Sequence, residues 1–161
     1  MTTFKTADLC DLHGNAVLTC HAPLFNFGGR SWFAGRIATV ETFEDAALVR
    51  RALEEPGHGR VLVVDGGGSR RTALLGDKMA LLATSNGWGG VVIHGAVRDV
   101  EALSRMDIAV LALNAVPFRS NSVGLGTVGN QLNFGGASFV HDQFCYGDRD
   151  GLVISSRNLL A

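Results

Sequence analysis

The sequence predicts an α/β fold in which a central mixed sheet is flanked by helices. Strand and helix patterns alternate from residue 35 to residue 113, which is typical of parallel β/α layers. From residue 131 onward the chain holds short strand patterns separated by Gly-Asp turns, which favours mixed or antiparallel additions to the sheet. The 161 residues, 47% of them hydrophobic and 18% charged, suit one domain spanning residues 1–161.

The amino-terminal part leads into the alternating region. Residues 1–14 are predicted to form a short helix capped by Thr6 or Asp8 and ended by Gly14. The next expected elements are, in chain order, a strand at 15–20, an aromatic and Gly-rich loop at 23–35 and a strand at 35–40.

The middle of the chain carries the clearest periodicity. An amphipathic helix is predicted over 44–55, where Pro56-Gly57 ends it. The apolar run at 61–65 is typical of a strand buried on both faces. The remaining expected elements are helices at 77–86 and 99–105, strands at 91–94 and 108–113, a Ser/Asn/Gly-rich connection at 114–129, and short strands at 131–134, 137–140 and 152–154.

Composition and charge exclude several classes of protein. A formal net charge of −1 gives no electrostatic signature of direct nucleic-acid binding. Three widely spaced cysteines, without a Cys-x-x-Cys pair, indicate reduced thiols and no zinc site. The amino terminus has no apolar run of signal-peptide length, and no stretch approaches the length of a membrane span, so we expect a soluble cytoplasmic protein.

The segment 76–99 holds the residues with the strongest chemical signal. Gly76 and Asp77 stand at the start of a predicted helix, where unpaired amides of the first turn, through Lys78 and Met79, suit an anion such as a carboxylate. Asp77 acting only as a helix cap is the alternative, and the two roles are compatible.

Arg98 and Asp99 follow the next predicted strand. The guanidinium can hold a carboxylate or an enolate oxygen through two hydrogen bonds, and the carboxylate can bind Mg²⁺ or Mn²⁺. A surface salt bridge combined with a helix cap is the alternative. If the strands at 61–65 and 91–94 are parallel neighbours, Asp65, Asp77, Arg98 and Asp99 should converge in one cleft.

Other motifs carry weaker signals. The run from Asp65 to Ser69 resembles a phosphate loop but lacks the Gly-Lys-Ser/Thr ending, so a tight turn is expected. His94 is expected to be a hydrogen-bonded core residue. Trp32 and Phe33 could stack on bases, although a core role fits the net charge better.

Taken together, these motifs resemble the RraA-like family, which includes 4-hydroxy-4-methyl-2-oxoglutarate aldolases and regulators of ribonuclease activity A. The spacing of Asp77, twenty residues, then Arg98-Asp99 resembles the family signature. The blocks that carry the resemblance are FGGRSWFAG at 27–35, VLVVDGGGS at 61–69, ALLGDKMA at 73–80, NGWGGVVIHGAVRD at 86–99 and GDRDGLVI at 147–154.

The resemblance implies a swivelling β/α/β fold, a homotrimer and a metal-dependent lyase acting on small 2-oxo acids. It implies that Asp99 binds the divalent metal, that Asp77 holds a water of that metal and takes part in proton transfer, and that Arg98 stabilises an enolate. The amides from Gly76 to Met79, including that of Lys78, would bind the substrate carboxylate. The implied reactions are cleavage of 4-hydroxy-4-methyl-2-oxoglutarate to two pyruvates and decarboxylation of oxaloacetate.

The same family offers a second function, that of a non-enzymatic regulator that binds and inhibits a ribonuclease E-type endonuclease. The chain stops at Ala161, without the longer carboxy-terminal segment of some family aldolases, and its length is nearer the regulator branch. Clustering of Asp142, Asp148 and Asp150 on the surface, away from the cleft, would favour the regulator.

Overall fold

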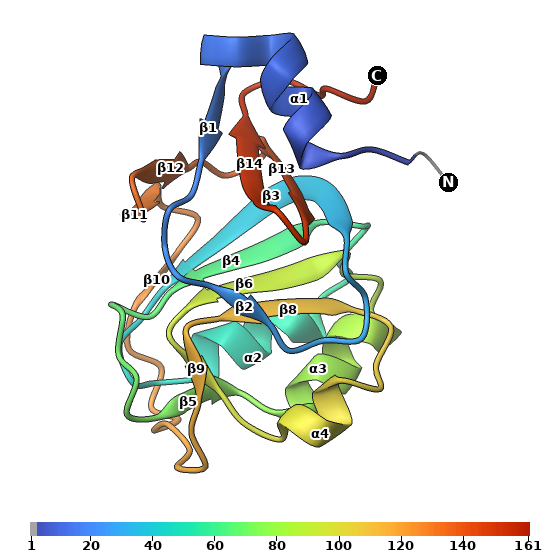
Figure 1. Ribbon diagram of the computed structural model, residues 1–161. Coiled ribbons are helices and arrows are strands. Elements are labelled where there is room, and N and C mark those ends of the chain that lie inside the picture. The colour runs from blue at the N-terminus through green and yellow to red at the C-terminus, as the bar shows by residue number, and fades with distance from the viewer. Residues whose placement is uncertain (1–2) are drawn as a thin grey trace.

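The computed structural model describes residues 3–161 and contains a nine-stranded mixed sheet with three helices on one face (Figure 1). This arrangement confirms the predicted α/β fold. In chain order the elements are α1 (Thr6–His13), a 3₁₀ turn (Gly14–Ala16), β1 (Val17–Thr19), β2 (Phe25–Asn26), β3 (Phe33–Glu41), α2 (Ala47–Glu54), β4 (Val61–Asp65), β5 (Ala73–Leu75), α3 (Asp77–Ser85), β6 (Gly90–His94), β7 (Ala96–Val97), α4 (Val100–Leu103), β8 (Ala109–Ala112), β9 (Asn114–Ala115), β10 (Thr127–Val128), β11 (Leu132–Phe134), β12 (Ala137–Phe139), β13 (Phe144–Asp148) and β14 (Gly151–Ser155).

The centre of the sheet is parallel and its edges are antiparallel. The strand order is β1-β14-β13-β3-β4-β6-β8-β2, in which β3, β4, β6 and β8 run parallel. The hairpin β13–β14 and strand β1 extend one edge, β2 extends the other, and β10 pairs with the far end of β3. The carboxyl ends of the four parallel strands therefore meet at one edge of the fold.

The parallel strands are buried on both faces because they alternate between two apolar clusters. In β4, Leu62 and Val64 pack toward helices α2, α3 and α4, whereas Val61 and Val63 pack toward the β11–β12 hairpin and the curled β13–β14 edge (Figure 1). All four side chains are fully buried. Each such burial contributes about 1.5–3 kcal/mol, which explains the uninterrupted apolar run in the sequence.

A second, three-stranded parallel sheet extends the carboxyl ends of the main strands. It has the order β5-β7-β9. Strand β7 begins after Gly95, directly beyond β6, and β9 begins after Leu113, directly beyond β8. These strands of two or three residues are too short to give a periodic signal, so the sequence did not predict them.

Several predicted boundaries were wrong for local reasons. Helix α2 begins at Ala47 and not at 44, because Glu44 has a left-handed backbone (φ 52°) and the Asp45 side chain accepts the Ala47 amide. Helix α4 covers only four residues of the predicted 99–105. Strand β13 was missed because its residues gain their register from β3 and β14 and not from a pattern of their own. Within residues 3–161, no helix is long and apolar enough to cross a membrane.

Helix α1 is attached to the turn between β13 and β14 by one carboxylate. The prediction that Thr6 or Asp8 caps the helix is wrong, since Lys5 occupies the N-cap position and no side chain caps it. Thr6 donates instead to Asp148, through its amide (2.7 Å) and its hydroxyl (2.6 Å). Burial raises the pKa of Asp148, but these hydrogen bonds and the amides of Asp150 and Gly151 outweigh burial and lower it.

We expect Asp148→Asn to lower the free energy of unfolding by roughly 1–3 kcal/mol at pH 7. Because the folded pKa of Asp148 is depressed, its stabilisation is present above the unfolded value of about 3.9 and is lost as the pH falls through the folded pKa. Urea unfolding from pH 7 to pH 2.5 should therefore show a difference between wild type and variant that shrinks below pH 4. A difference that stays constant across this range would contradict the assignment.

Candidate active site

The pairing of β5 with β7 brings the two halves of the predicted site together. Leu75 aligns with Val97, and the Arg98 amide donates to the Leu75 carbonyl at 3.0 Å. Gly76 therefore lies beside Arg98 and Asp99. A Cβ atom at position 76 would stand 2.5 Å from Asp99 Oδ2 and 3.4 Å from Arg98 Cγ, so glycine is what lets these groups approach.

Asp99 adopts a left-handed backbone (φ 60°, ψ 41°), which is uncommon outside glycine. Its side chain does not cap α4, the helix that follows it, but accepts the amide of Asp77 at 3.0 Å. Within residues 3–161, neither Arg98 nor Asp99 forms a salt bridge. The helix-cap part of the alternative therefore holds for α3, whereas no salt bridge of this pair occurs within residues 3–161. Local strain of this kind gathers at functional sites.

The first turn of α3 is bounded by two carboxylates. Asp99 accepts the Asp77 amide, and Asp77 Oδ1 accepts the Lys78 amide at 2.8 Å. No acceptor is found for the Met79 amide among the described residues. Two of the amides expected to bind a substrate carboxylate are therefore occupied by the chain's own carboxylates. The other oxygens, Asp77 Oδ2 and Asp99 Oδ1, have no hydrogen bond within residues 3–161.

A cavity of about 440 Å³ opens next to this turn. Its lining includes Gly76, Met79 and Arg98 from the predicted set, whereas Asp77, Lys78 and Asp99 stand outside the lining. Lys78 is exposed to solvent. The opposite wall comes from α2 and from the segment 118–122. This segment belongs to the predicted Ser/Asn/Gly-rich connection, for which the sequence predicts no functional role. The available signal was that this segment follows a parallel strand at its carboxyl end.

Asp45 holds that opposite wall in place. It is 1% exposed, and its carboxylate accepts the amides of Ala47 (3.0 Å), Val123 (2.9 Å) and Gly124 (3.1 and 3.2 Å). Burial raises the pKa of Asp45, but these amides and that of Leu125 together lower it, so the carboxylate stays charged. One buried charge thus joins the start of α2 to the loop that faces Gly76.

Asp65 does not converge with the other predicted acids. Strands β4 and β6 are parallel neighbours, as expected, but Asp65 pairs with His94 at 3.3 Å and accepts the Gly67 amide at 2.9 Å. His94 stacks on Phe134 with ring centroids 4.6 Å apart, which confirms a hydrogen-bonded, largely packed histidine. The run from Gly66 to Ser69 forms a tight turn, as predicted, in which the Ser69 amide donates to the Gly66 carbonyl.

Of the two aromatic residues considered for base stacking, Phe33 lies in the core and Trp32 lies near the surface. Phe33 is buried, as the expected core role requires, at 1% exposure. Trp32 is only partly buried and packs edge-on against Phe4, with the Arg30 guanidinium 5.1 Å from its ring. Neighbouring side chains thus cover only part of Trp32, which also lines a cavity of about 450 Å³.

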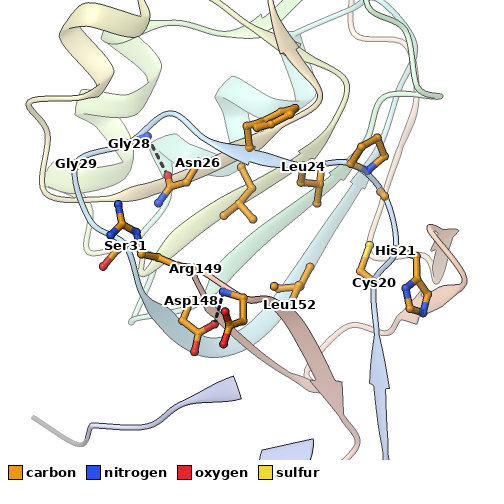
Figure 2. A pocket seen from close by; sticks show the side chains of 16 residues that line it. Cys20, His21, Leu24, Asn26, Gly28, Gly29, Ser31, Asp148, Arg149 and Leu152 are labelled. Carbon is orange, nitrogen blue, oxygen red and sulfur yellow. Dashed lines mark hydrogen bonds between the residues drawn. The ribbon is translucent and has the colours of Figure 1, made fainter. Parts of the chain in front are cut away.

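A larger cavity, of about 620 Å³, lies elsewhere, between segment 20–31 and the β13–β14 turn (Figure 2). Its polar groups stabilise the turns that form it: Asn26 Oδ1 accepts the Gly28 amide, and Asp148 Oδ1 accepts the Asp150 amide, both at 2.9 Å (Figure 2). None of the predicted site residues lines it. Asp148 and Asp150 lie together at the β13–β14 turn, whereas Asp142 precedes the other end of β13, so the three acids do not form one cluster.

Comparisons with known proteins identify the family of this chain. The sequence profile of the RraA-like family, described as Aldolase/RraA, matches residues 6–154. A protein of Aromatoleum aromaticum named "Putative 4-hydroxy-4-methyl-2-oxoglutarate aldolase" is 48% identical over 157 residues, which is 98% of this chain and 99% of that protein.

Two solved structures are similarly close. One from Geobacillus kaustophilus, described as an S-adenosylmethionine:2-dimethylmenaquinone methyltransferase, has a TM-score of 0.94 and 45% identity, with 98% of each chain covered. The RNA-processing inhibitor RraA from Thermus thermophilus has a TM-score of 0.93 and 46% identity, covering 97% of this chain and 94% of that one.

We expect Asp45→Asn to lower the free energy of unfolding by roughly 2–3 kcal/mol, because an amide cannot replace a charge that accepts several buried N–H groups. Hydrogen exchange at the Val123 and Gly124 amides should accelerate. Asp107→Asn is the matched control, since Asp107 is 84% exposed and solvent screens its ion pair with Arg30, so its loss should be much smaller. Equal losses in the two variants would contradict the anchoring role.

Proposed function

Because the chain belongs to the RraA-like family, we propose that it is a divalent-metal-dependent carbon–carbon lyase acting on 2-oxo dicarboxylic acids. The proposed reactions are cleavage of 4-hydroxy-4-methyl-2-oxoglutarate to two pyruvates and decarboxylation of oxaloacetate. One observation carries the proposal: the β5–β7 pairing sets the Asp99 carboxylate and the Arg98 guanidinium against the start of α3. The relatives named as aldolases support the same class of reaction.

The residues around Gly76 fit a magnesium or manganese ion. No group of three or more His, Cys, Asp or Glu side chains suited to a metal occurs within residues 3–161. Magnesium commonly takes only one or two carboxylates and keeps several waters, so Asp99 as ligand and Asp77 beside it make a sufficient donor set. When bound, the ion would supply a Lewis acid for the substrate's 2-oxo group.

The chain's own groups account for the rest of the chemistry. The Met79 amide would bind the substrate carboxylate, joined by the Asp77 and Lys78 amides once the two carboxylates turn away from them. Asp77 would accept the proton of the 4-hydroxyl group as the C3–C4 bond breaks. The electron pair of that bond enters a pyruvate enolate, whose charge Arg98 would stabilise.

The same enolate forms when oxaloacetate loses CO₂, so one site serves both reactions. A Schiff-base mechanism is not needed. The sequence has two lysines, Lys5 and Lys78, and Lys78 is exposed and outside the cavity lining.

We also propose that the chain forms a homotrimer. Exposed apolar side chains occur along residues 118–128, which begin with the cavity wall, and at Phe43, whose neighbour Thr42 donates to the Leu125 carbonyl; they are Phe43, Phe118, Val123, Leu125 and Val128. Such a surface is typical of an interface between subunits.

Protein stripped with EDTA should release no pyruvate from 4-hydroxy-4-methyl-2-oxoglutarate, and Mg²⁺ or Mn²⁺ should restore the reaction. A coupled lactate dehydrogenase assay measures the product, with metal alone as the blank. Asp99→Asn should abolish turnover and weaken Mn²⁺ binding, whereas Glu101→Gln, which removes an exposed carboxylate two residues away, should change neither. Arg98→Ala should lower kcat/KM about 30- to 1,000-fold through lost charge stabilisation.

Rates with either acid that equal the metal blank would remove the lyase assignment. Unchanged turnover in Arg98→Ala would remove that residue from the mechanism but leave the metal requirement in place.

A second candidate is a regulator that binds a ribonuclease E-type endonuclease, supported by the likeness to the RNA-processing inhibitor RraA of Thermus thermophilus. Adding an excess of this protein to such an endonuclease should then slow cleavage of an RNA substrate. Asp99→Asn separates the two functions, because it should abolish lyase activity without affecting inhibition. Undiminished cleavage at saturating protein would exclude this candidate.

A further inference from the structure

The cavity beside Gly76 is lined by positive charge. Its lining contains three arginines and no Asp or Glu. The arginines are Arg50 of α2, Arg98 after β7 and Arg119 of the opposite wall. The lining also includes the polar residues Ser120 and Asn121. A cavity of this composition suits an anion that carries more than one charge.

Two of these three arginines, Arg98 and Arg119, have no carboxylate partner among residues 3–161. Within residues 3–161, neither Arg98 nor Arg119 has an Asp or Glu oxygen within 4.0 Å, and Arg50 reaches Glu54 only at that limit. Arg71, by contrast, donates two hydrogen bonds to Glu44, at 2.8 and 2.9 Å. Unpaired guanidinium groups in a cavity are available to bind carboxylates through two hydrogen bonds.

The backbone of Arg119 is fixed at one end of the cavity. Arg119 forms a bridge with Ala73; the Ala73 amide donates to the Phe118 carbonyl at 2.8 Å, and the Ser120 amide donates to the Ala73 carbonyl at 3.1 Å. Ala73 precedes Gly76 by three residues, which is about 10 Å of extended chain. The Arg119 backbone therefore lies at the start of β5, whereas the proposed metal and enolate groups lie at the end of β5.

We infer that Arg119, assisted by Arg50, binds the second carboxylate of the substrate and makes the site selective for dianionic 2-oxo acids. This inference rests on the proposed function, because it takes the first carboxylate to lie at the start of α3. Arg98 would then act on the developing enolate between the two ends. The binding of both ends would orient the C3–C4 bond across the site.

The placement has a consequence for the choice between the two reactions. In aldol cleavage the distal carboxylate keeps its charge and leaves within the second pyruvate, so its contact with Arg119 persists in the transition state. In decarboxylation the distal carboxylate becomes neutral CO₂, and the contact stabilises the substrate more than the transition state. Arg119 should therefore favour aldol cleavage over decarboxylation.

A matched pair of ligands tests the inference without turnover. 2-Oxoglutarate and 2-oxopentanoate share a five-carbon chain and differ by one terminal carboxylate. Calorimetric titration in Mg²⁺ should show that the protein binds 2-oxoglutarate at least about tenfold more tightly. Arg119→Gln should lose about 10- to 100-fold in affinity for 2-oxoglutarate and leave 2-oxopentanoate unchanged. Arg119→Lys should retain part of the preference, and Arg105→Gln, an exposed arginine outside the cavity, should retain all of it.

The inference is overturned if the protein does not bind 2-oxoglutarate more tightly than 2-oxopentanoate, or if Arg119→Gln weakens the binding of both ligands equally. Turnover supplies an independent readout, in which Arg119→Gln should lower kcat/KM for 4-hydroxy-4-methyl-2-oxoglutarate more than for oxaloacetate. Equal losses for both substrates would also count against it. If the protein shows the preference for 2-oxoglutarate but has no lyase activity, the proposed function is wrong and the inference about Arg119 stands.

Discussion

The candidate site depends on a single parallel pairing of two very short strands. The hydrogen bond from the Arg98 amide to the Leu75 carbonyl fixes the register of β5 and β7, and this register sets Gly76 against Asp99. The main sheet makes the pairing possible because β6 continues directly into β7, so the position of β7 is inherited from the buried core. The buried apolar core of the main sheet thus fixes the position of this small polar site.

The conformation of Asp99 follows from the same constraint. With the chain leaving β7 in a left-handed turn, the carboxylate is directed back to the start of α3 and not forward to α4. Asp tolerates this backbone better than most residues, and the cost is balanced by the hydrogen bond to the Asp77 amide. The result is a pair of acidic side chains at the positive end of a helix, where their charges are stabilised.

The site therefore separates its charges in space. Carboxylates gather at the start of α3, and arginines occupy the adjoining cavity. Asp45 contributes indirectly, because its buried carboxylate anchors the loop at Val123 and Gly124, which continues the wall that carries Arg119. A negative region beside a positive region is the arrangement that the proposed metal-dependent enolate chemistry on a dicarboxylic acid would use.

The sequence by itself determined the α/β layering, the four central strands and the resemblance to the family, because apolar runs, helix stops and long motif blocks are local properties of the chain; that these strands pair in parallel came from the structure. It also singled out Gly76, Asp77, Arg98 and Asp99, whose residue types indicate their chemistry. It could not predict that Asp65 turns to His94, that segment 118–122 faces Gly76, or that Asp99 contacts α3. Those facts depend on contacts between segments about 20 to 80 residues apart, some of them made by strands too short for any periodic signal, and only the folded chain sets such contacts.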